Sequence, residues 1–200
     1  MSFPLRAKAE KHNSHITHID FDKVGAHIRS NCGAHELLYF KTADGEQIMH
    51  PSDLKDTRWA SKTTTLGWHI QSIHPDAADG AEVLAANVSP DEKLVATGDD
   101  LGRVKIFRYP CINKGAQFQF GLGHAAPIQN VRFTADSQYV VSCGGADRTV
   151  MQWRVTPRVI PNSGAAEAEA KAIAAAAEAG TSGGAGKAIG DGSDSKGAEA

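Results

Sequence analysis

The chain has 200 residues, enough for one domain of ordinary size together with a tail. Its formal net charge is −2, and the charges are interspersed, so the composition does not indicate a nucleic-acid-binding protein. Its three cysteines, Cys32, Cys111 and Cys143, are odd in number and lack paired spacing. This argues against a disulfide framework and fits a reducing compartment such as the cytosol.

The N-terminal stretch MSFPLRAKAEKHNSH carries charges without an apolar run, so we expect no signal peptide. No segment of the chain approaches the roughly 20 apolar residues that a membrane-spanning helix needs. We therefore expect neither nucleic acid nor a membrane as a partner.

Residues 12–22, HNSHITHIDFD, place His12, His15 and His18 at intervals of three, which raises the question of a metal site. In an extended strand, residues three apart point to opposite faces of the sheet. That geometry is poor for a single ion, so we predict no metal here.

Residues 12–156 are predicted to form short strands. Runs rich in β-branched and aromatic residues occupy 28–31, 36–41, 93–98, 103–107, 139–143 and 149–155. Asp44-Gly45 between two such runs is a strong hairpin signal. No long segment shows helical periodicity, so the ordered part is predicted to be all-β.

A three-fold repeat emerges within this region, in residues 12–40, 79–107 and 123–153. The matching anchors are His12, Ile16, Phe21 and Phe40, then Asp79, Val83, Val88 and Phe107, then His124, Ile128, Phe133 and Trp153. The first anchors of the second and third units lie 45 residues apart, a spacing typical of propeller blades, whereas those of the first and second units lie 67 apart. The extra length is an insert, residues 54–75, that is itself strand-like.

The third unit resembles a WD repeat, because it opens with Gly123-His124, carries Asp147 in a turn and closes a strand with Trp153. In that family the histidine, a strand hydroxyl, the turn aspartate and the tryptophan form a buried hydrogen-bonded chain. The hydroxyl position here is assigned to Cys143, with Ser142 beside it.

The first two units keep less of this pattern. Ser30 and Thr97 occupy the strand position of Cys143, and Phe40 and Phe107 close the units. His12 takes the place of His124, which makes it a structural residue. The slot of the turn aspartate holds Ala34 and Leu101, so the chain of hydrogen bonds is predicted to be incomplete there.

Specific motifs extend the resemblance to one family. The stretches RSNCGAHELLYF, LGWHIQSIHPDAADG, ATGDDLGRVKIFRYPC and SQYVVSCGGADRTVMQWRV resemble the C-terminal WD-repeat blades of the second propeller of echinoderm microtubule-associated protein-like (EMAP-like) proteins. The resemblance covers roughly residues 10–156. It implies a non-catalytic cytoskeletal interaction module with tubulin or microtubules as partners. The expected location is cytoplasmic and cytoskeletal, on microtubules, with the cilium left open.

The domain organisation follows from these units. Residues 10–156 are predicted to be a partial WD-repeat β-propeller of about three to three and a half blades, too few to close a circle. We expect the chain to be a fragment of a longer protein, or to be completed by blades of a partner chain. Residues 157–200 are almost wholly Ala, Gly, Ser, Glu and Lys, so we predict a disordered tail.

Candidate partner contacts lie in the insert, where Lys55, Arg58 and Lys62 could meet the acidic surface of tubulin. An interpretation as ordinary solvated charges stays open. A second functional hypothesis is a generic WD-repeat scaffold of a ciliary or signalling complex, which would not require the insert.

The third hypothesis, an enzyme, rests on Cys32 with His35 nearby, a pair that could suggest a thiol nucleophile. The repeat places Cys32 just past a strand, where a structural role is favoured. The glycine runs GLGH and CGGAD do not open a helix and so do not indicate phosphate loops. We expect no catalytic residues, cofactor or metal.

Overall fold

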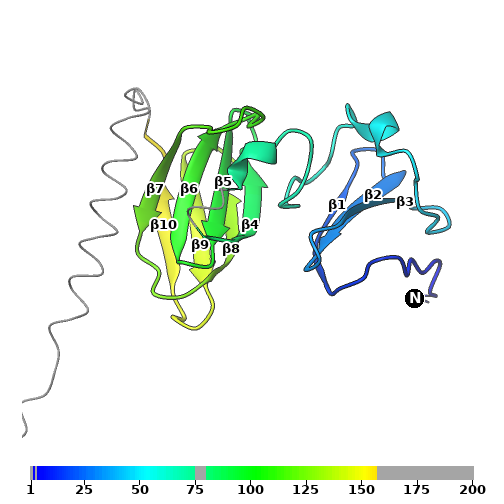
Figure 1. The fold of residues 1–200 in the computed structure, drawn as a ribbon, viewed down its shortest axis with the longest axis horizontal. Helices are drawn as coiled ribbons and strands as arrows, with labels where there is room; N and C mark the ends of the chain where they lie inside the picture. The colour runs from blue at the N-terminus through cyan, green and yellow to red at the C-terminus, as the bar shows by residue number, and fades with distance from the viewer. Residues whose placement is uncertain (1, 3, 75–79, 157–200) are drawn as a thin grey trace, which may run out of the picture. The chain divides into compact units, whose positions relative to one another are not determined.

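The computed structural model describes residues 2, 4–74 and 80–156, which contain ten strands in three antiparallel sheets (Figure 1). The first sheet consists of β1 (Ile16–Phe21), β2 (His27–Cys32) and β3 (Leu37–Lys41). The second consists of β4 (Val83–Val88), β5 (Leu94–Asp99), β6 (Arg103–Arg108) and β7 (Phe118–Leu122). The third consists of β8 (Ile128–Phe133), β9 (Tyr139–Gly144) and β10 (Val150–Arg154).

This arrangement confirms the prediction of an all-β, partial propeller. The six predicted strand runs between residues 28 and 155 are all present, and in the described residues the three sheets do not close into a ring (Figure 1). No helix in this part of the chain is long and apolar enough to cross a membrane. The predicted tail, residues 157–200, lies outside the described residues, as does the anchor Asp79.

The repeat is visible in the backbone as a recurring irregularity. Each sheet begins with a register shift in its first strand pair, between Ile16 and His18, between Val83 and Ala85, and between Ile128 and Asn130. These are the same positions in the three units. An extra residue at one place in each blade increases the local twist of the strand pair, so the three units share a fold as well as a pattern.

The Asp44-Gly45 turn forms, but its second arm is short. Gly45 has a φ of +76°, the left-handed conformation that glycine adopts readily. The amide of Lys41 donates to Glu46 and that of Ile48 donates to Tyr39, at 2.9 and 2.8 Å. Beyond these bonds, pairing is limited to an isolated bridge between Phe40 and Gln47.

The strand-like expectation for the insert is wrong for its described part, residues 54–74. This segment contains the end of the 3₁₀ helix η1 (Pro51–Leu54), the 3₁₀ helix η2 (Gln71–Ile73) and one bridge from Trp59 to Asp22, but no strand. The physical reason is that the amides of Thr63 and Thr64 bond to the carboxylate of Asp20 instead of to a neighbouring strand.

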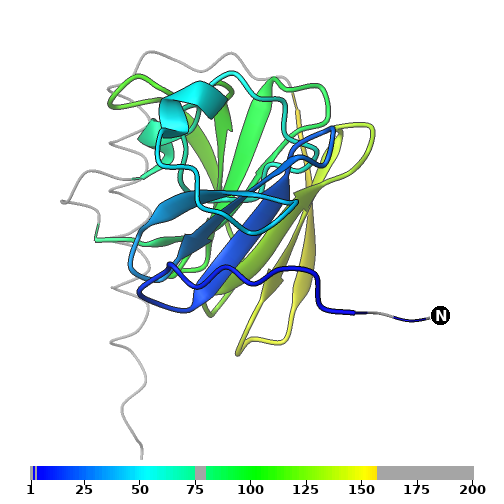
Figure 2. The same cartoon turned by 90° about the vertical axis from the view of Figure 1, so that its right-hand side faces the viewer.

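The second and third sheets share a packed layer, because β4 and β5 lie against β8 (Figures 1 and 2). Its buried side chains are Ala85, Ala96, Val104, Ile128, Val131 and Val140, with the ring of Trp153 packed at the side. Small residues let the sheets approach closely. A Cβ at Gly98 would collide with Ile128, so β5 needs glycine at this point.

Two further clusters cover the other faces. Ile70 and Ile73 of the insert pack with Val95 and Phe107 on the opposite face of the second sheet. Under the first sheet, Tyr39 packs against Leu54 and Trp59. Both clusters contain residues of the segment between β3 and β4, so that segment packs against both the first and the second sheet.

We predict that Ile128→Ala lowers the free energy of unfolding by about 2–5 kcal/mol, because it leaves a cavity in the layer between the second and third sheets. Ile128 is fully buried, at 0% exposure, whereas Val150 in the same sheet is 74% exposed. Val150→Ala is therefore the control, with an expected change within about 0.5 kcal/mol. Urea unfolding of both variants checks this, and equal stabilities would contradict the described packing.

Candidate functional site

A buried chain of hydrogen bonds crosses the third sheet. His124, just before β8, lies 2.7 Å from Asp147 through Nδ1 and 2.7 Å from the Ser142 hydroxyl through Nε2. The indole Nε1 of Trp153 donates to the same hydroxyl at 2.7 Å. Thr149 adds a hydroxyl bond to the Asp147 carboxylate. Each polar group in this hydrogen-bonded network thus has a partner, and the network fixes the turn between β9 and β10.

The structure places Ser142, and not Cys143, at the hydroxyl position. Ser142 pairs with the buried Val131 and is itself 1% exposed, whereas Cys143 points to the other face because side chains alternate along a strand. Histidine and hydroxyl are 18 positions apart both here and in the first unit. The extra residue of the third unit therefore lies after the hydroxyl, and counting back from Trp153 misses it by one.

In the first unit, the Nε2 of His12 lies 2.7 Å from the Ser30 hydroxyl, and its ring lies 6.1 Å from that of the buried Phe40. The acid of this unit is Glu36, which the pattern search missed because Glu36 lies two residues beyond Ala34. Its carboxylate accepts from the amide of Asn13 at 3.0 Å, as Asp147 accepts from the amide of Ala125.

The second unit departs further from the pattern. Thr97 is fully buried, and Phe107 is buried against Phe118, with 5.3 Å between the ring centres. Leu101, in the slot of the turn aspartate, is 56% exposed. The acid near this turn is Asp99, which accepts from Arg103 at 2.7 Å and lies 3.5 Å from Lys105.

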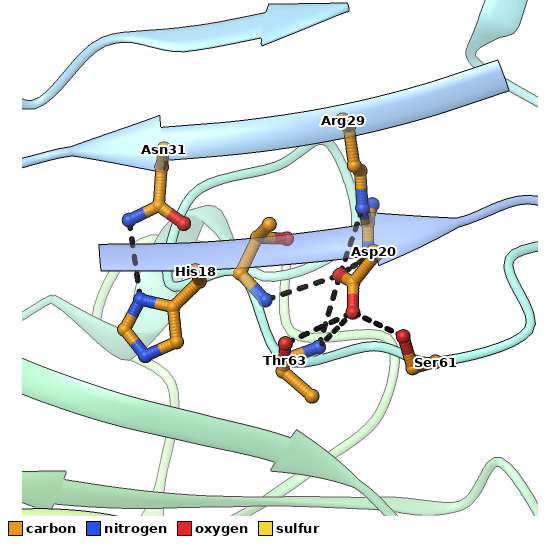
Figure 3. A network of polar contacts seen from close by, with 7 residues as sticks. His18, Asp20, Arg29, Asn31, Ser61 and Thr63 are labelled. Atoms are coloured by element: carbon orange, nitrogen blue, oxygen red, sulfur yellow. Dashed lines mark hydrogen bonds and ion pairs between the residues drawn. The ribbon is translucent and has the colours of Figure 1, made fainter. Parts of the chain in front are cut away.

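The carboxylate of Asp20 in β1 gathers several hydrogen bonds from the insert and so attaches the insert to the first sheet (Figure 3). Asp20 is fully buried and accepts two bonds from the guanidinium of Arg29, at 3.0 and 2.9 Å. On the other side it accepts from the hydroxyls of Ser61 and Thr63 and from the amides of Thr63 and Thr64. One side chain thereby ties β1, β2 and the insert together.

The ionised form of Asp20 is the one that this environment favours. Burial by itself raises the pKa of the Asp20 carboxyl, but the neighbouring Arg29 charge and the donors of the insert outweigh burial and lower the pKa below its ordinary value. Sequence reasoning did not single out Asp20. The only signal was a carboxylate inside a strand with an apolar neighbour on each side.

Backbone bonds continue the attachment in both directions. The amide of Ala60 donates to Phe21 in β1, and the amide of Lys23 donates to Arg58. Further along, the amide of Val88 in β4 donates to the carbonyl of Lys62 at 3.3 Å. The insert therefore bridges the first and second sheets at a fixed register.

A pocket of about 320 Å³ lies beside this bridge. Basic and aromatic side chains dominate its polar wall: Arg29, Arg58, Lys62, His69, Trp59 and Tyr109. Asp56 and Glu92 also contribute, while Val88, Val95 and Ile70 form the apolar floor. Two of the three basic residues singled out from the sequence, Arg58 and Lys62, are thus brought to one cavity.

Two of the cations that line this pocket lie over aromatic rings. The Arg29 guanidinium is 4.5 Å from the centre of the Trp59 ring, and the Lys62 ammonium is 5.1 Å from that of Tyr109. Lys62 also pairs with Glu92 at 2.9 Å. Lys55 is exposed outside the pocket lining, 5.9 Å from the ring of Trp68.

Cys32 and His35 do not form a thiol–imidazole pair. The Cys32 thiol donates to Glu36 at 3.3 Å, while the exposed ring of His35 lies 3.8 Å from Glu82. Burial raises the pKa of the Cys111 thiol to about 11, so that cysteine stays protonated at neutral pH.

The three histidines at intervals of three do not come together. His15 contacts Ser14, and His18 contacts Thr17 and Asn31, while His12 turns to Ser30. Among the described residues, a group with metal-ligand geometry does exist, but it consists of His12, Cys32 and Glu36.

Comparisons with known proteins point to one family. The family model described as "Echinoderm microtubule-associated protein second beta-propeller" matches residues 2–155. The chain is 39% identical over 145 residues to echinoderm microtubule-associated protein-like 3 of Mus musculus, covering 72% of this chain and 16% of that protein. It is 36% identical over 148 residues to the 77 kDa echinoderm microtubule-associated protein of Strongylocentrotus purpuratus, covering 74% and 22%.

The chain thus spans between 16% and 22% of the length of these relatives. Among solved structures, it is similar to the Cps50 (Swd1) β-propeller domain of Myceliophteria thermophila, at a TM-score of 0.49 and 14% identity, over 78% of this chain and 57% of that one. It is also similar to the computationally designed Ika4 protein, at a TM-score of 0.45 and 16% identity, over 78% and 100%. The match to the family rests on sequence and not on these structural likenesses.

We predict that Ser142→Ala lowers the free energy of unfolding by about 1–3 kcal/mol, because it removes the partner of both His124 and Trp153. Cys143→Ala, one residue away on the other face, should change it by less than about 1 kcal/mol. Denaturant unfolding measures both. A larger loss of stability in the Cys143 variant would contradict Ser142 as the partner of His124 and Trp153.

We expect Asp20→Asn to cost about 3–5 kcal/mol at neutral pH, because it leaves Arg29 buried without its counter-charge. Since folding lowers the pKa of Asp20, its contribution is fully present above the unfolded pKa of about 4 and is lost as the pH falls through the folded value. The gap between wild type and variant should therefore narrow below about pH 4. Urea unfolding across this pH range tests it, with the exposed Asp53→Asn as control; a pH-independent gap contradicts the assignment.

Proposed function

Because the chain belongs to the EMAP-like family, we propose that it is a non-catalytic interaction module of a second propeller, which contributes a basic, aromatic-lined pocket to microtubule association. The observation that carries the proposal is the insert. Its attachment through Asp20 holds Arg58 and Lys62 at one cavity, next to Arg29, Trp59 and Tyr109. The relatives are named as microtubule-associated proteins, which supports tubulin as the partner and a cytoplasmic, cytoskeletal location.

The chemistry of the pocket suits an acidic peptide segment. Arginine over tryptophan presents a planar donor that can bond a carboxylate while stacked. Lys55 on the neighbouring surface would extend the basic area. Contacts on loops held by a rigid sheet scaffold are the usual way in which propellers bind partners. Long-range attraction to an acidic surface would raise the association rate and weaken with salt.

The open sheets need further blades. Three apolar side chains on β1 remain about half exposed, namely Ile16 (52%), Ile19 (52%) and Phe21 (45%). Propellers cover such faces by closing the ring. We propose that blades of a longer chain, or of a partner chain, pack here.

The alternative function is a generic WD-repeat scaffold in a ciliary or signalling assembly. It is favoured if the partner-binding surface does not include the insert. In that case the polar chain through His124 would serve stability alone, and the basic residues near the pocket would be ordinary solvated charges.

The test compares two variants of equal charge in a microtubule cosedimentation assay. In one, Lys55, Arg58 and Lys62 are all changed to Gln; in the control, Lys8, Lys11 and Lys41 are changed to Gln. With about 0.2–1 kcal/mol for each exposed pairing, the first variant should bind roughly 3- to 150-fold more weakly, and the control like wild type at matched salt. Equal weakening of both variants would contradict the site. A folded chain that never pellets with microtubules would favour the scaffold hypothesis.

A further inference from the structure

We propose a zinc site in the first blade, formed by His12, Cys32 and Glu36 and independent of the pocket. The Nδ1 of His12, the Sγ of Cys32 and a carboxylate oxygen of Glu36 lie within 4.8 Å of one another. The carboxylate oxygen is 3.6 Å from His12 Nδ1 and 3.3 Å from Cys32 Sγ. Tetrahedral zinc with its usual bond lengths holds such ligand atoms about 3.3–3.7 Å apart.

The second observation is an unsatisfied nitrogen aimed into the cluster. The side chain of His12 is only 6% exposed, yet its Nδ1 has no hydrogen-bond partner in the described part of the chain. A buried polar atom without a partner costs about 1–3 kcal/mol. Its other nitrogen, Nε2, bonds to Ser30, which orients the ring so that Nδ1 faces Glu36.

The arrangement of His12, Cys32 and Glu36 differs from the hydrogen-bonded network of the third blade. There, Asp147 reaches the Nδ1 of His124 directly at 2.7 Å. The residue at the position of Cys32 is Gly144, since Ile16 pairs with Cys32 as Ile128 pairs with Gly144. A Cβ at Gly144 would collide with the Asp147 carboxylate.

In the first blade, a cysteine replaces that glycine and a longer acid replaces the aspartate. The direct bond is lost, and instead a nitrogen, a sulfur and a carboxylate oxygen lie within 4.8 Å of one another.

The donor set is chemically suited to zinc. One imidazole, one thiolate and one carboxylate are ligands that zinc prefers, and their two negative charges balance Zn²⁺. On binding, the Cys32 thiol releases its proton to solvent and a Zn–S bond forms, without any change of oxidation state. The side chain of Glu36 is 29% exposed, which gives the ion a route in and leaves the fourth position to water.

The experiment is a zinc titration of the full chain by calorimetry, with Co²⁺ as a spectroscopic probe of the thiolate. We expect one zinc ion per chain and, with Co²⁺, a near-ultraviolet sulfur-to-metal charge-transfer band. Cys32→Ser should abolish the band, and His12→Gln should weaken zinc binding by at least about 100-fold. The matched controls, Cys143→Ser and His15→Gln, should bind like wild type.

Two results would overturn the proposal. One is a folded wild-type chain that binds no zinc at micromolar concentration. The other is zinc binding or a charge-transfer band that survives Cys32→Ser. Because the first result is read on the wild type, it stands even if a variant fails to fold. Ser30→Ala adds a graded test, since the loss of its bond to His12 should weaken zinc binding by about 10-fold and leave the charge-transfer band in place.

Discussion

The buried carboxylate of Asp20 is the interaction on which the arrangement of the first sheet and the insert depends. A charged group at 0% exposure is costly unless every lone pair is used. Here one guanidinium and four donors of the insert use them, so the cost is offset only when β1, β2 and the insert are all in place. The network therefore couples the position of the insert to the folding of the sheet.

This coupling explains how the insert, which contains no strand in its described part, is fixed in position by hydrogen bonds. Thr63 and Thr64 are buried, yet their amides donate to the side chain of Asp20 instead of to a neighbouring strand. The carbonyl of Lys62 then bonds to Val88 of the second sheet. The side chains of Arg58 and Lys62, which precede the residues bound to Asp20, consequently line a cavity between two sheets. This cavity is the proposed site of partner recognition.

The sequence predicted the fold well because strand alternation and repeat spacing can both be read from the order of residues alone, without knowledge of long-range contacts. Ile16, Val83 and Ile128 recur in register, and each marks a bulge of the same kind. Prediction failed where a contact depended on residues far apart in the chain. The insert looked like a strand because Thr63–Thr65 are β-branched, and only the position of Asp20, more than 40 residues earlier, shows why they do not pair.

The candidate sites were partly predictable for the same reason. Arg58 and Lys62 were found from charge within the insert, whereas Arg29 and Trp59 could not be placed at the same pocket without the fold. The hydroxyl of the third blade was missed by one residue, since the additional residue lies in the turn after Ser142 and the count from Trp153 includes it. Counting from the histidine avoids this error, because the turn in that interval, between β8 and β9, has the same length as the corresponding turn between β1 and β2.

The three blades differ in chemistry at one structurally equivalent position, the last residue of the second strand of each unit. It is Cys32 in the first blade, Asp99 in the second and Gly144 in the third, each opposite the second anchor of its unit (Ile16, Val83 and Ile128). Glycine there leaves room for the aspartate of the following turn. Aspartate there supplies the acid itself and takes Arg103 as its partner. Cysteine there displaces the acid outward and leaves the histidine nitrogen unpaired. The repeat thus keeps its backbone while this one side chain decides whether the turn is closed by a hydrogen bond, by an ion pair or, as we propose for the first blade, by a metal ion.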